Sequence, residues 1–276
     1  MTPIEPTIPI TSREYKAMLK PHPLSGTSDS LNRTLEALRR SLLSITDLKL
    51  KGEFVFEKDQ KVRFWDFPQN WLKDRKNYVL RTRKRKNKTT LTLKCRHGDR
   101  YFVQSQITSG DQAKFEEDIK PRFTSLYSYS RKVKASAPRS LKELIDIFPD
   151  LKNRIETDPP DSPIQLVRDF TARERVYTGV TIKLSKSFDA ECAVIIWYDA
   201  DDPENVSPLV AEFSFRYPMK KWTKHPPPEP FNTFDGKTGL AAHDFYISLQ
   251  NSREFADAWL DTESKTKTLY AYEGNR

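Results

Sequence analysis

The stretch that decides the fold is NYVLRTRKRKNKTTLTLKCRHGDR, residues 77–100. It alternates on both sides of Asn87, which is typical of two β-strands joined by a tight turn. Arg81 and Arg83 occupy alternate positions on the first strand, and Lys94 alternates with leucines on the returning strand. A face with so many cations must lie either in water or against anions, because unpaired charges are costly to bury.

The positive charge of the chain is local. The formal net charge is +9, and residues 73–100 alone carry twelve Lys or Arg against two Asp, so the rest of the chain carries −1. This distribution favours a site that attracts anions. A solvated hairpin tip that keeps an edge strand from aggregating is the alternative, and charge alone leaves both open.

The composition is that of a folded globular protein. Of the 276 residues 37% are apolar, and sixteen Phe, eleven Tyr and five Trp are available to fill a core. We predict one domain over residues 1–276, with an extended segment at 1–11 and loops at 157–163 and 225–230.

The compartment is predicted from the cysteines and the N-terminus. Cys95 and Cys192 are scattered in strand-like runs, which favours a reducing compartment. The opening MTPIEPTIPI lacks the charged and apolar regions of a signal peptide, and no apolar run approaches the ~20 residues that span a bilayer. We expect a soluble cytoplasmic or nuclear protein with no membrane partner, and its oligomeric state stays open.

Leucines at spacings of three and four predict an amphipathic helix over residues 29–46. A second helix over 140–148 begins with a capping box formed by Ser140 and Glu143. Residues 240–260 also have a helical pattern, in two pieces.

Period-two alternation predicts at least eight strands. The segments that alternate are 12–19, 47–57, 61–67, 77–95, 100–107, 113–120, 125–134, 173–184, 190–199, 208–217 and 265–273. A turn at 58–60 separates the second segment from the third. Clean alternation indicates antiparallel pairing. The fold class is therefore α+β, an antiparallel β-barrel of about eight or more strands with a few flanking helices, and a barrel of this size can enclose one small ligand.

Several of these strands place charges of both signs on one face. Arg and Lys bind phosphate oxygens, and Glu and Asp hold Mg²⁺ or Mn²⁺, so such a lumen suits a polyanion with a divalent metal. Amphipathic strands with their charges in water are the alternative. A nucleic-acid groove also stays open, because Tyr78, Tyr101 and Phe102 interleave with cations. No phosphate-binding glycine loop, G-x-S-x-G or paired-cysteine motif is present.

The order of these segments resembles the CYTH, or triphosphate tunnel metalloenzyme, superfamily. YVLRTRKRKNKTTLTLK is similar to its central hairpin and KFEEDI to its acidic strand, and RERVY, LVAEFSF and SREYKAML resemble three further strands. The resemblance covers roughly residues 12–217. It implies a tunnel barrel that binds a triphosphate-containing ligand with a divalent metal. Family members hydrolyse inorganic triphosphate, thiamine triphosphate or RNA 5′-triphosphate ends, or cyclise ATP.

The resemblance also implies site residues. Phosphate binding is expected of Lys16, Arg81, Arg83, Lys94, Arg173, Arg175 and Arg216. Mg²⁺ or Mn²⁺ is expected at Glu14, Glu116, Asp118 and Glu212, of which Glu116, Asp118 and Glu212 are also the expected catalytic residues.

Two departures from the family pattern reduce the number of carboxylates available to bind a metal ion. Ser12 and Ser214 stand where the family pattern has carboxylates, whereas the phosphate-binding cations are retained. The leading hypothesis is a metal-dependent phosphohydrolase acting on a triphosphate or other polyphosphate-bearing substrate. The alternatives are a non-catalytic barrel that binds a nucleotide or an RNA 5′ end, and a tunnel-fold enzyme with altered chemistry on a phosphorylated organic substrate.

Overall fold

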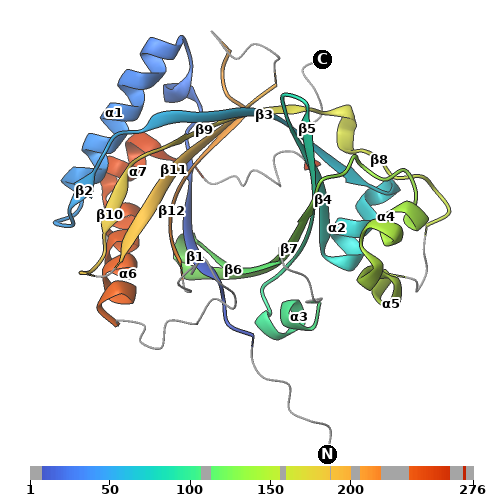
Figure 1. The fold of residues 1–276 in the computed structure, drawn as a ribbon. Coiled ribbons are helices and arrows are strands. Elements are labelled where there is room, and N and C mark those ends of the chain that lie inside the picture. Colours follow the sequence, from blue (N-terminus) through green and yellow to red (C-terminus); the bar gives the residue numbers. More distant parts are fainter. Residues whose placement is uncertain are drawn as a thin grey trace, which may run out of the picture.

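The computed structural model describes residues 8–106, 113–155, 160–186, 188–199, 206–218, 236–261 and 270–271. Within them, nine strands close into a barrel (Figure 1). In order around the barrel they are β12 (Val210–Pro218), β1 (Ser12–Leu19), β6 (Lys114–Lys120), β7 (Thr124–Val133), β5 (Lys88–His97), β4 (Tyr78–Arg85), β3 (Val55–Asp66), β9 (Ala172–Thr178) and β11 (Asp189–Tyr198). β11 pairs with β12, and this pairing closes the ring.

The predicted barrel with flanking helices is confirmed, but its pairing is mixed rather than purely antiparallel. β1 and β6 run parallel, whereas the other eight neighbouring pairs of the ring are antiparallel. Only strands joined by a tight hairpin must run in opposite directions. β1 and β6 lie far apart in the sequence, so alternation within each strand did not reveal their relative direction.

Short elements complete the fold. Four further strands extend the sheet, namely β2 (Leu50–Lys51), β8 (Gln165–Leu166), β10 (Thr181–Lys183) and β13 (Leu260–Asp261). The α-helices are α1 (Ser28–Ser44), α2 (Trp71–Lys76), α3 (Arg100–Ser105), α4 (Leu141–Ile147), α5 (Lys152–Ile155), α6 (Gly236–Asn251) and α7 (Arg253–Trp259). Single 3₁₀ turns lie at His22–Leu24, Pro68–Asn70, Pro121–Phe123, Pro149–Leu151 and Val167–Asp169. No helix within the described residues is long and apolar enough to cross a membrane.

The hydrophobic core lies mainly outside the barrel wall. Outward side chains of β1, β9, β11 and β12 pack against α1, α6 and α7, on the left of Figure 1. Outward side chains of β4, β5, β6 and β7 pack against α2 to α5. The leucines of α1 are buried in the first of these clusters, as their spacing predicts. Because the apolar faces point outward, the opposite faces of the same strands are left to line the lumen.

A third apolar cluster occupies part of the barrel interior. It joins Phe64 of β3, Trp197 of β11 and Phe170 with the ring of Tyr270, whose centroid lies 6.1 Å from that of Phe64. The polar cavity therefore takes up only the remaining part of the lumen.

Two predicted features were wrong. Residues 100–107 were expected to form a strand, but Arg100–Ser105 is the helix α3, because the Asp99 carboxylate accepts hydrogen bonds from the backbone of Tyr101 and Phe102 and caps it. The expected turn at 58–60 is also absent. β3 continues through it with a bulge after Phe56 and stays paired with β9.

Some predicted segments lie wholly or partly outside the described residues. The loop at 225–230 does so entirely, and so does most of the expected strand at 265–273. Of the predicted extended segment 1–11 and the predicted loop 157–163, the structure describes residues 8–11 and 160–163. Neither part has regular secondary structure, as expected.

The start of α4 gives a test of local structure. The Ser140 hydroxyl accepts a hydrogen bond from Glu143 N at 3.2 Å, and the Glu143 carboxylate accepts one from Arg139 N at 2.8 Å. Ser140→Ala should lower the free energy of unfolding by about 1 kcal/mol, because an N-cap is lost. Ser44→Ala, at the last residue of the helix α1, should change the free energy of unfolding by less than about 0.5 kcal/mol. Urea denaturation measures both, and equal losses would contradict the capping role.

Candidate functional site

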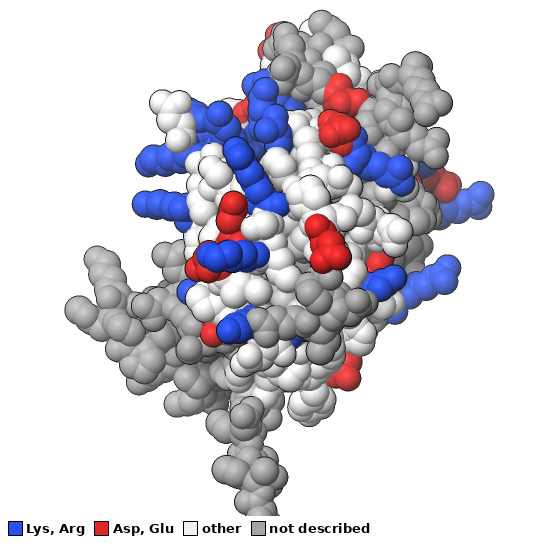
Figure 2. Space-filling model, turned by 90° about the vertical axis from the view of Figure 1, so that its right-hand side faces the viewer, with Lys and Arg blue, Asp and Glu red and all other residues white. Residues whose placement is uncertain are grey.

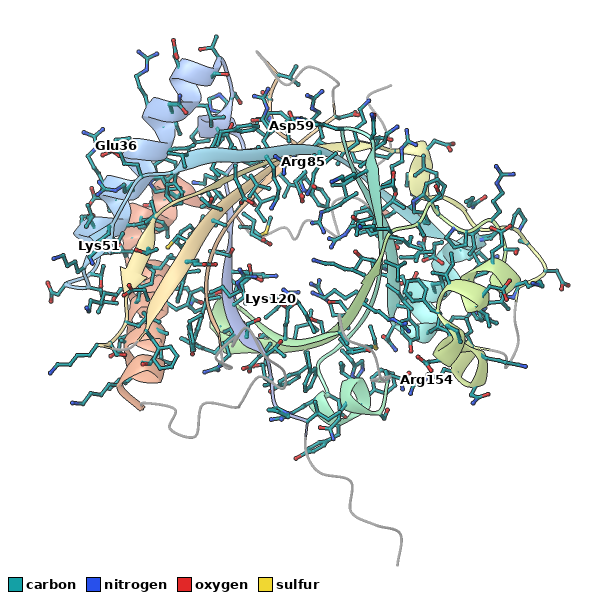
Figure 3. All side chains as sticks on the ribbon, in the orientation of Figure 1. Glu36, Lys51, Asp59, Arg85, Lys120 and Arg154 are labelled. Carbon is teal, nitrogen blue, oxygen red and sulfur yellow. The ribbon has the colours of Figure 1, made fainter. Side chains whose placement is uncertain are left out.

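The barrel encloses a cavity of about 670 Å³. Among the described residues, ten Lys or Arg side chains line it, against the five acids Glu14, Glu116, Asp118, Glu212 and Asp261. Figure 3 shows many nitrogen-tipped side chains reaching into the open centre, and the labelled Lys120 is one of them. The cavity therefore has an excess of positive charge.

The cationic hairpin contributes one side of this cavity. Arg81, Arg83 and Lys94 all line it, as the alternation of the hairpin predicts. On the neighbouring strands Lys94 pairs in register with Ser130, and Ser130 with Lys114. Since residues in register lie on the same face, these side chains follow one another around the wall. We call Arg81, Arg83, Lys94, Lys114 and Lys132, all of which line the cavity, the cationic wall.

Among the described residues Arg81 makes no ion pair, although the charges of Glu174 and Glu116 act on its guanidinium from a greater distance. Its Nε is buried and has no hydrogen-bond partner among the described residues, and its guanidinium carbon lies 5.9 Å from the centre of the Phe64 ring. Burial, and then the charge of Arg83, lower the pKa of Arg81 to about 9. The guanidinium therefore stays charged at neutral pH, and a buried donor without a partner is costly unless a ligand supplies one.

Arg83 is held by an acid that sequence analysis did not select. Its Nε and Nη2 donate to the two oxygens of Glu174, at 3.1 and 3.2 Å. Glu174, which is 1% exposed, also accepts hydrogen bonds from Gln60 at 2.5 Å and from the Trp197 indole at 2.8 Å. These contacts fix the position of Arg83 at the edge of the cationic wall.

Arg173 and Arg175 do not line the cavity. β9 pairs with β3 so that Glu174 lies opposite Gln60, and this register puts Glu174 on the lumen face. The two arginines therefore lie on the other face, where both pair with Asp59, at 2.6 and 3.5 Å. The expectation that they bind phosphate in the lumen does not agree with this placement.

A group of charges around Asp118 adjoins the cationic wall, and Lys94 belongs to both. Lys16 Nζ lies 3.0 Å from Asp118 Oδ1, and Arg96 Nη2 lies 2.9 Å and Lys94 Nζ 3.7 Å from Asp118 Oδ2. Asp118 is 1% exposed. Burial alone would raise its pKa, but the three cations hold the pKa of Asp118 well below its usual range. Arg96, which lies on the same face of β5 as Lys94, was not singled out from the sequence.

Three lysines of the cavity, Lys94, Lys120 and Lys132, have a pKa below the usual value. Burial, together with the nearby Arg96, lowers the pKa of Lys94 to about 8, although Asp118 opposes this shift. Burial and the cations Lys114 and Arg83 also lower the pKa of Lys132. The cationic wall is therefore crowded with like charges, which an anion would relieve.

The remaining expected site residues all line the cavity. Glu14 lies 3.0 Å from Lys16 Nζ, and Glu116 accepts a hydrogen bond from the Ser12 hydroxyl at 3.2 Å. Arg216 pairs with the exposed Glu191 at 3.0 Å. Glu212 is buried on the lumen face of β12.

Two of the acids expected to hold a metal ion, Glu14 and Asp118, are paired with cations, and this pairing does not fit a divalent ion at these positions. The described residues contain no group of three or more His, Cys, Asp or Glu side chains that could hold one. Both oxygens of Asp118 already face cations, and Glu14 Oε2 faces Lys16. Mg²⁺ needs oxygen ligands at about 2.0–2.1 Å, and these oxygens are engaged by ammonium and guanidinium groups instead.

The outer surface has a different distribution of charge. Figure 2 shows Lys and Arg side chains interspersed with Asp and Glu on the face that carries α2, α4 and α5. Interspersed charges are ordinary for a solvated surface. The excess of cations within the barrel is therefore the feature that points to a ligand.

Comparisons with known proteins give three similar structures. A candidate adenylyl cyclase from Hippeastrum with a dominant triphosphatase activity shares 10% identity, with 95% of each chain covered and a TM-score of 0.43. Candidate adenylate cyclases from Vibrio parahaemolyticus and Bacillus halodurans share 10% and 14% identity. For both, 95% of this chain is covered, with 99% and 100% of theirs and TM-scores of 0.36 and 0.37. No protein-family model and no curated protein matches the sequence.

Proposed function

We propose that the barrel binds a molecule with a triphosphate or other polyphosphate group, and that the phosphates lie in the lumen against the cationic wall. The observation that carries this proposal is the guanidinium of Arg81, whose Nε is buried and has no hydrogen-bond partner among the described residues. Phosphate oxygens accept hydrogen bonds from guanidinium groups, and such charge-assisted bonds are the strong ones.

The size and charge of the cavity support the same ligand class. Its volume of about 670 Å³ lies within the range of about 300–1,000 Å³ that small-molecule sites occupy. Ten cations against five acids leave a positive excess, and a cavity with low-dielectric walls concentrates the field of that excess. A single phosphate would meet only part of the wall, so a chain of phosphates is the better match.

Hydrolysis of the bound polyphosphate is a second candidate function. The position of Glu116 supports it. Its carboxylate lines the cavity and accepts a hydrogen bond from Ser12, and it lies on the same face of β6 as Lys114. In this reaction water attacks the terminal phosphorus as the bridging P–O bond breaks, and Glu116 accepts the proton of the water. The leaving phosphate oxygen takes the negative charge and faces the cationic wall.

A panel of ligands tests both candidates. Calorimetric titration with tripolyphosphate, ATP, GTP, thiamine triphosphate and diphosphate should give binding that weakens as salt is added. Phosphate release and ATP cyclisation are followed with the same ligands in EDTA, Mg²⁺ and Mn²⁺. Binding without turnover would leave an anion-binding barrel, and turnover that survives Glu116→Gln would remove Glu116 from the chemistry. No binding at low salt would refute the proposed function.

Lys94 gives the site a pH dependence. Because the pKa of Lys94 is about 8 in the protein, its ammonium loses its charge as the pH rises through that value. ATP affinity should therefore fall between about pH 7 and pH 9 in the wild type. Lys94→Gln should bind more weakly at pH 7 and lose most of this decline. Parallel profiles for the two proteins would contradict the assignment.

A further inference from the structure

The ammonium of Lys16 lies among carboxylates from three strands. Its Nζ is 3.0 Å from both Glu14 Oε2 and Asp118 Oδ1. Glu212 adds to their attraction, and the three acids together raise the pKa of Lys16 although burial lowers it. A permanently charged lysine therefore occupies the place where the acids of the barrel converge.

The register of the barrel explains this convergence. β1 lies between β6 and β12, with Glu14 in register with Asp118 on one side. On the other side Met18 is in register with Glu212, and Lys16 with Ser214. Residues in register lie on one face, so the wall itself holds the acids around Lys16.

Charges within this group balance. Glu14, Asp118 and Glu212 contribute three negative charges, and Lys16, Lys94 and Arg96 contribute three positive charges. The hydroxyls of Ser12 and Ser214 bond to Glu116 and Glu14 without adding charge. A divalent ion needs carboxylates with excess negative charge, and the balanced group does not supply that excess.

We propose that Lys16 serves as the built-in counter-ion of this carboxylate group, and that the barrel binds its polyphosphate ligand without a divalent metal ion. This inference rests on the proposed function, since it concerns the same lumen. With the acids neutralised internally, Arg81, Lys114 and Lys132 carry the positive excess that binds the phosphates. Lys94 belongs to both groups, so this balance holds only while its ammonium is charged. Mg²⁺ or Mn²⁺ in solution should then compete with the protein for the polyphosphate, because the ion binds free triphosphate.

The test titrates wild-type protein with tripolyphosphate by calorimetry, first in EDTA and then in excess Mn²⁺. We expect tighter binding in EDTA, and no heat when Mn²⁺ alone is added to the protein. Binding more than about tenfold weaker in EDTA than in Mn²⁺ would overturn the inference while leaving the proposed function intact. Binding in neither medium would refute both.

A variant addresses the role of Lys16 itself. Lys16→Gln leaves its carboxylates with excess negative charge, so Mn²⁺ should raise the melting temperature of this variant. The matched control is Lys20→Gln, at an exposed lysine just after β1, and neither it nor the wild type should respond. A Lys16→Gln protein whose melting temperature does not change when Mn²⁺ is added would overturn the counter-ion role. If that variant does not fold, the wild-type titrations still decide the question.

Discussion

Asp118→Asn is expected to lower the free energy of unfolding by about 3 kcal/mol. The carboxylate meets Lys16, Arg96 and Lys94, and removing it leaves these cations facing one another. Breaking a buried ion pair by removing one partner costs about 3–5 kcal/mol. The lower end of this range applies because the three cations line a cavity from which water can hydrate them.

Urea denaturation at neutral pH measures this loss. Asp150→Asn is the matched control, because Asp150 pairs with Arg131 at 3.4 Å on the exposed surface, where a pair contributes about 0–1 kcal/mol. Tripolyphosphate should restore part of the stability of Asp118→Asn, since the anion replaces the lost negative charge. A variant as stable as the control would show that Asp118 does not hold the group together.

The same ion-pair group predicts an acid-sensitive stability. The pKa of Asp118 is lowered on folding, so its contribution is fully present above the pKa of about 4 in the unfolded chain. It is lost as the pH falls below that value toward the folded pKa. The difference in unfolding free energy between the wild type and Asp118→Asn should therefore shrink below about pH 4. A difference that stays constant down to pH 2 would contradict this account.

Much of the cavity was predictable because side chains alternate strictly along a strand. Alternation fixes which residues share a face, and the hairpin has a leucine-rich face, so its other face was identified correctly. Arg81, Arg83 and Lys94 therefore line the cavity as expected. The same reasoning placed Glu116 and Asp118 together on β6.

β9 shows where alternation stops being informative. Both of its faces carry charged residues, so the sequence RERVY does not say which face is the lumen. Pairing with β3 decides it, by putting Glu174 opposite Gln60 and turning Arg173 and Arg175 outward. Arg96 was not predicted as a site residue because its contact with Asp118 depends on the pairing of distant strands. Only the closed barrel brings its Nη2 within 2.9 Å of Asp118 Oδ2.

Two features of the fold depend on information that strand patterns do not carry. The helix α3 forms because Asp99 caps it, although its sequence has the aromatic content of a strand. The parallel pairing of β1 with β6 depends on how distant segments meet when the barrel closes. Local sequence patterns therefore predicted the individual strands and helices better than they predicted how the strands pair to close the barrel.

Arg81→Glu is expected to weaken tripolyphosphate binding by at least about a hundredfold. The substitution removes a hydrogen bond to a charged group, worth about 1.5–3 kcal/mol. It also places a carboxylate among the phosphates, and like-charge juxtaposition costs several kcal/mol. The sum exceeds about 2.8 kcal/mol, which corresponds to a hundredfold in the dissociation constant. The effect should be large because Arg81 is half-buried in the lumen with its Nε out of contact with solvent, where salt screens its charge poorly.

Lys88→Glu is the matched control for this prediction. It makes the same reversal of charge in the same hairpin, but Lys88 is exposed at the first position of β5, next to the turn. Solvent and salt screen that charge, so its effect on affinity should be less than about tenfold and should vanish as salt is raised. Calorimetric titration of both variants in EDTA, with circular dichroism to confirm folding, gives the comparison. Equal losses at Arg81 and Lys88 would mean that phosphate binds to a diffuse basic surface, whereas a loss confined to Arg81 would assign binding to the lumen.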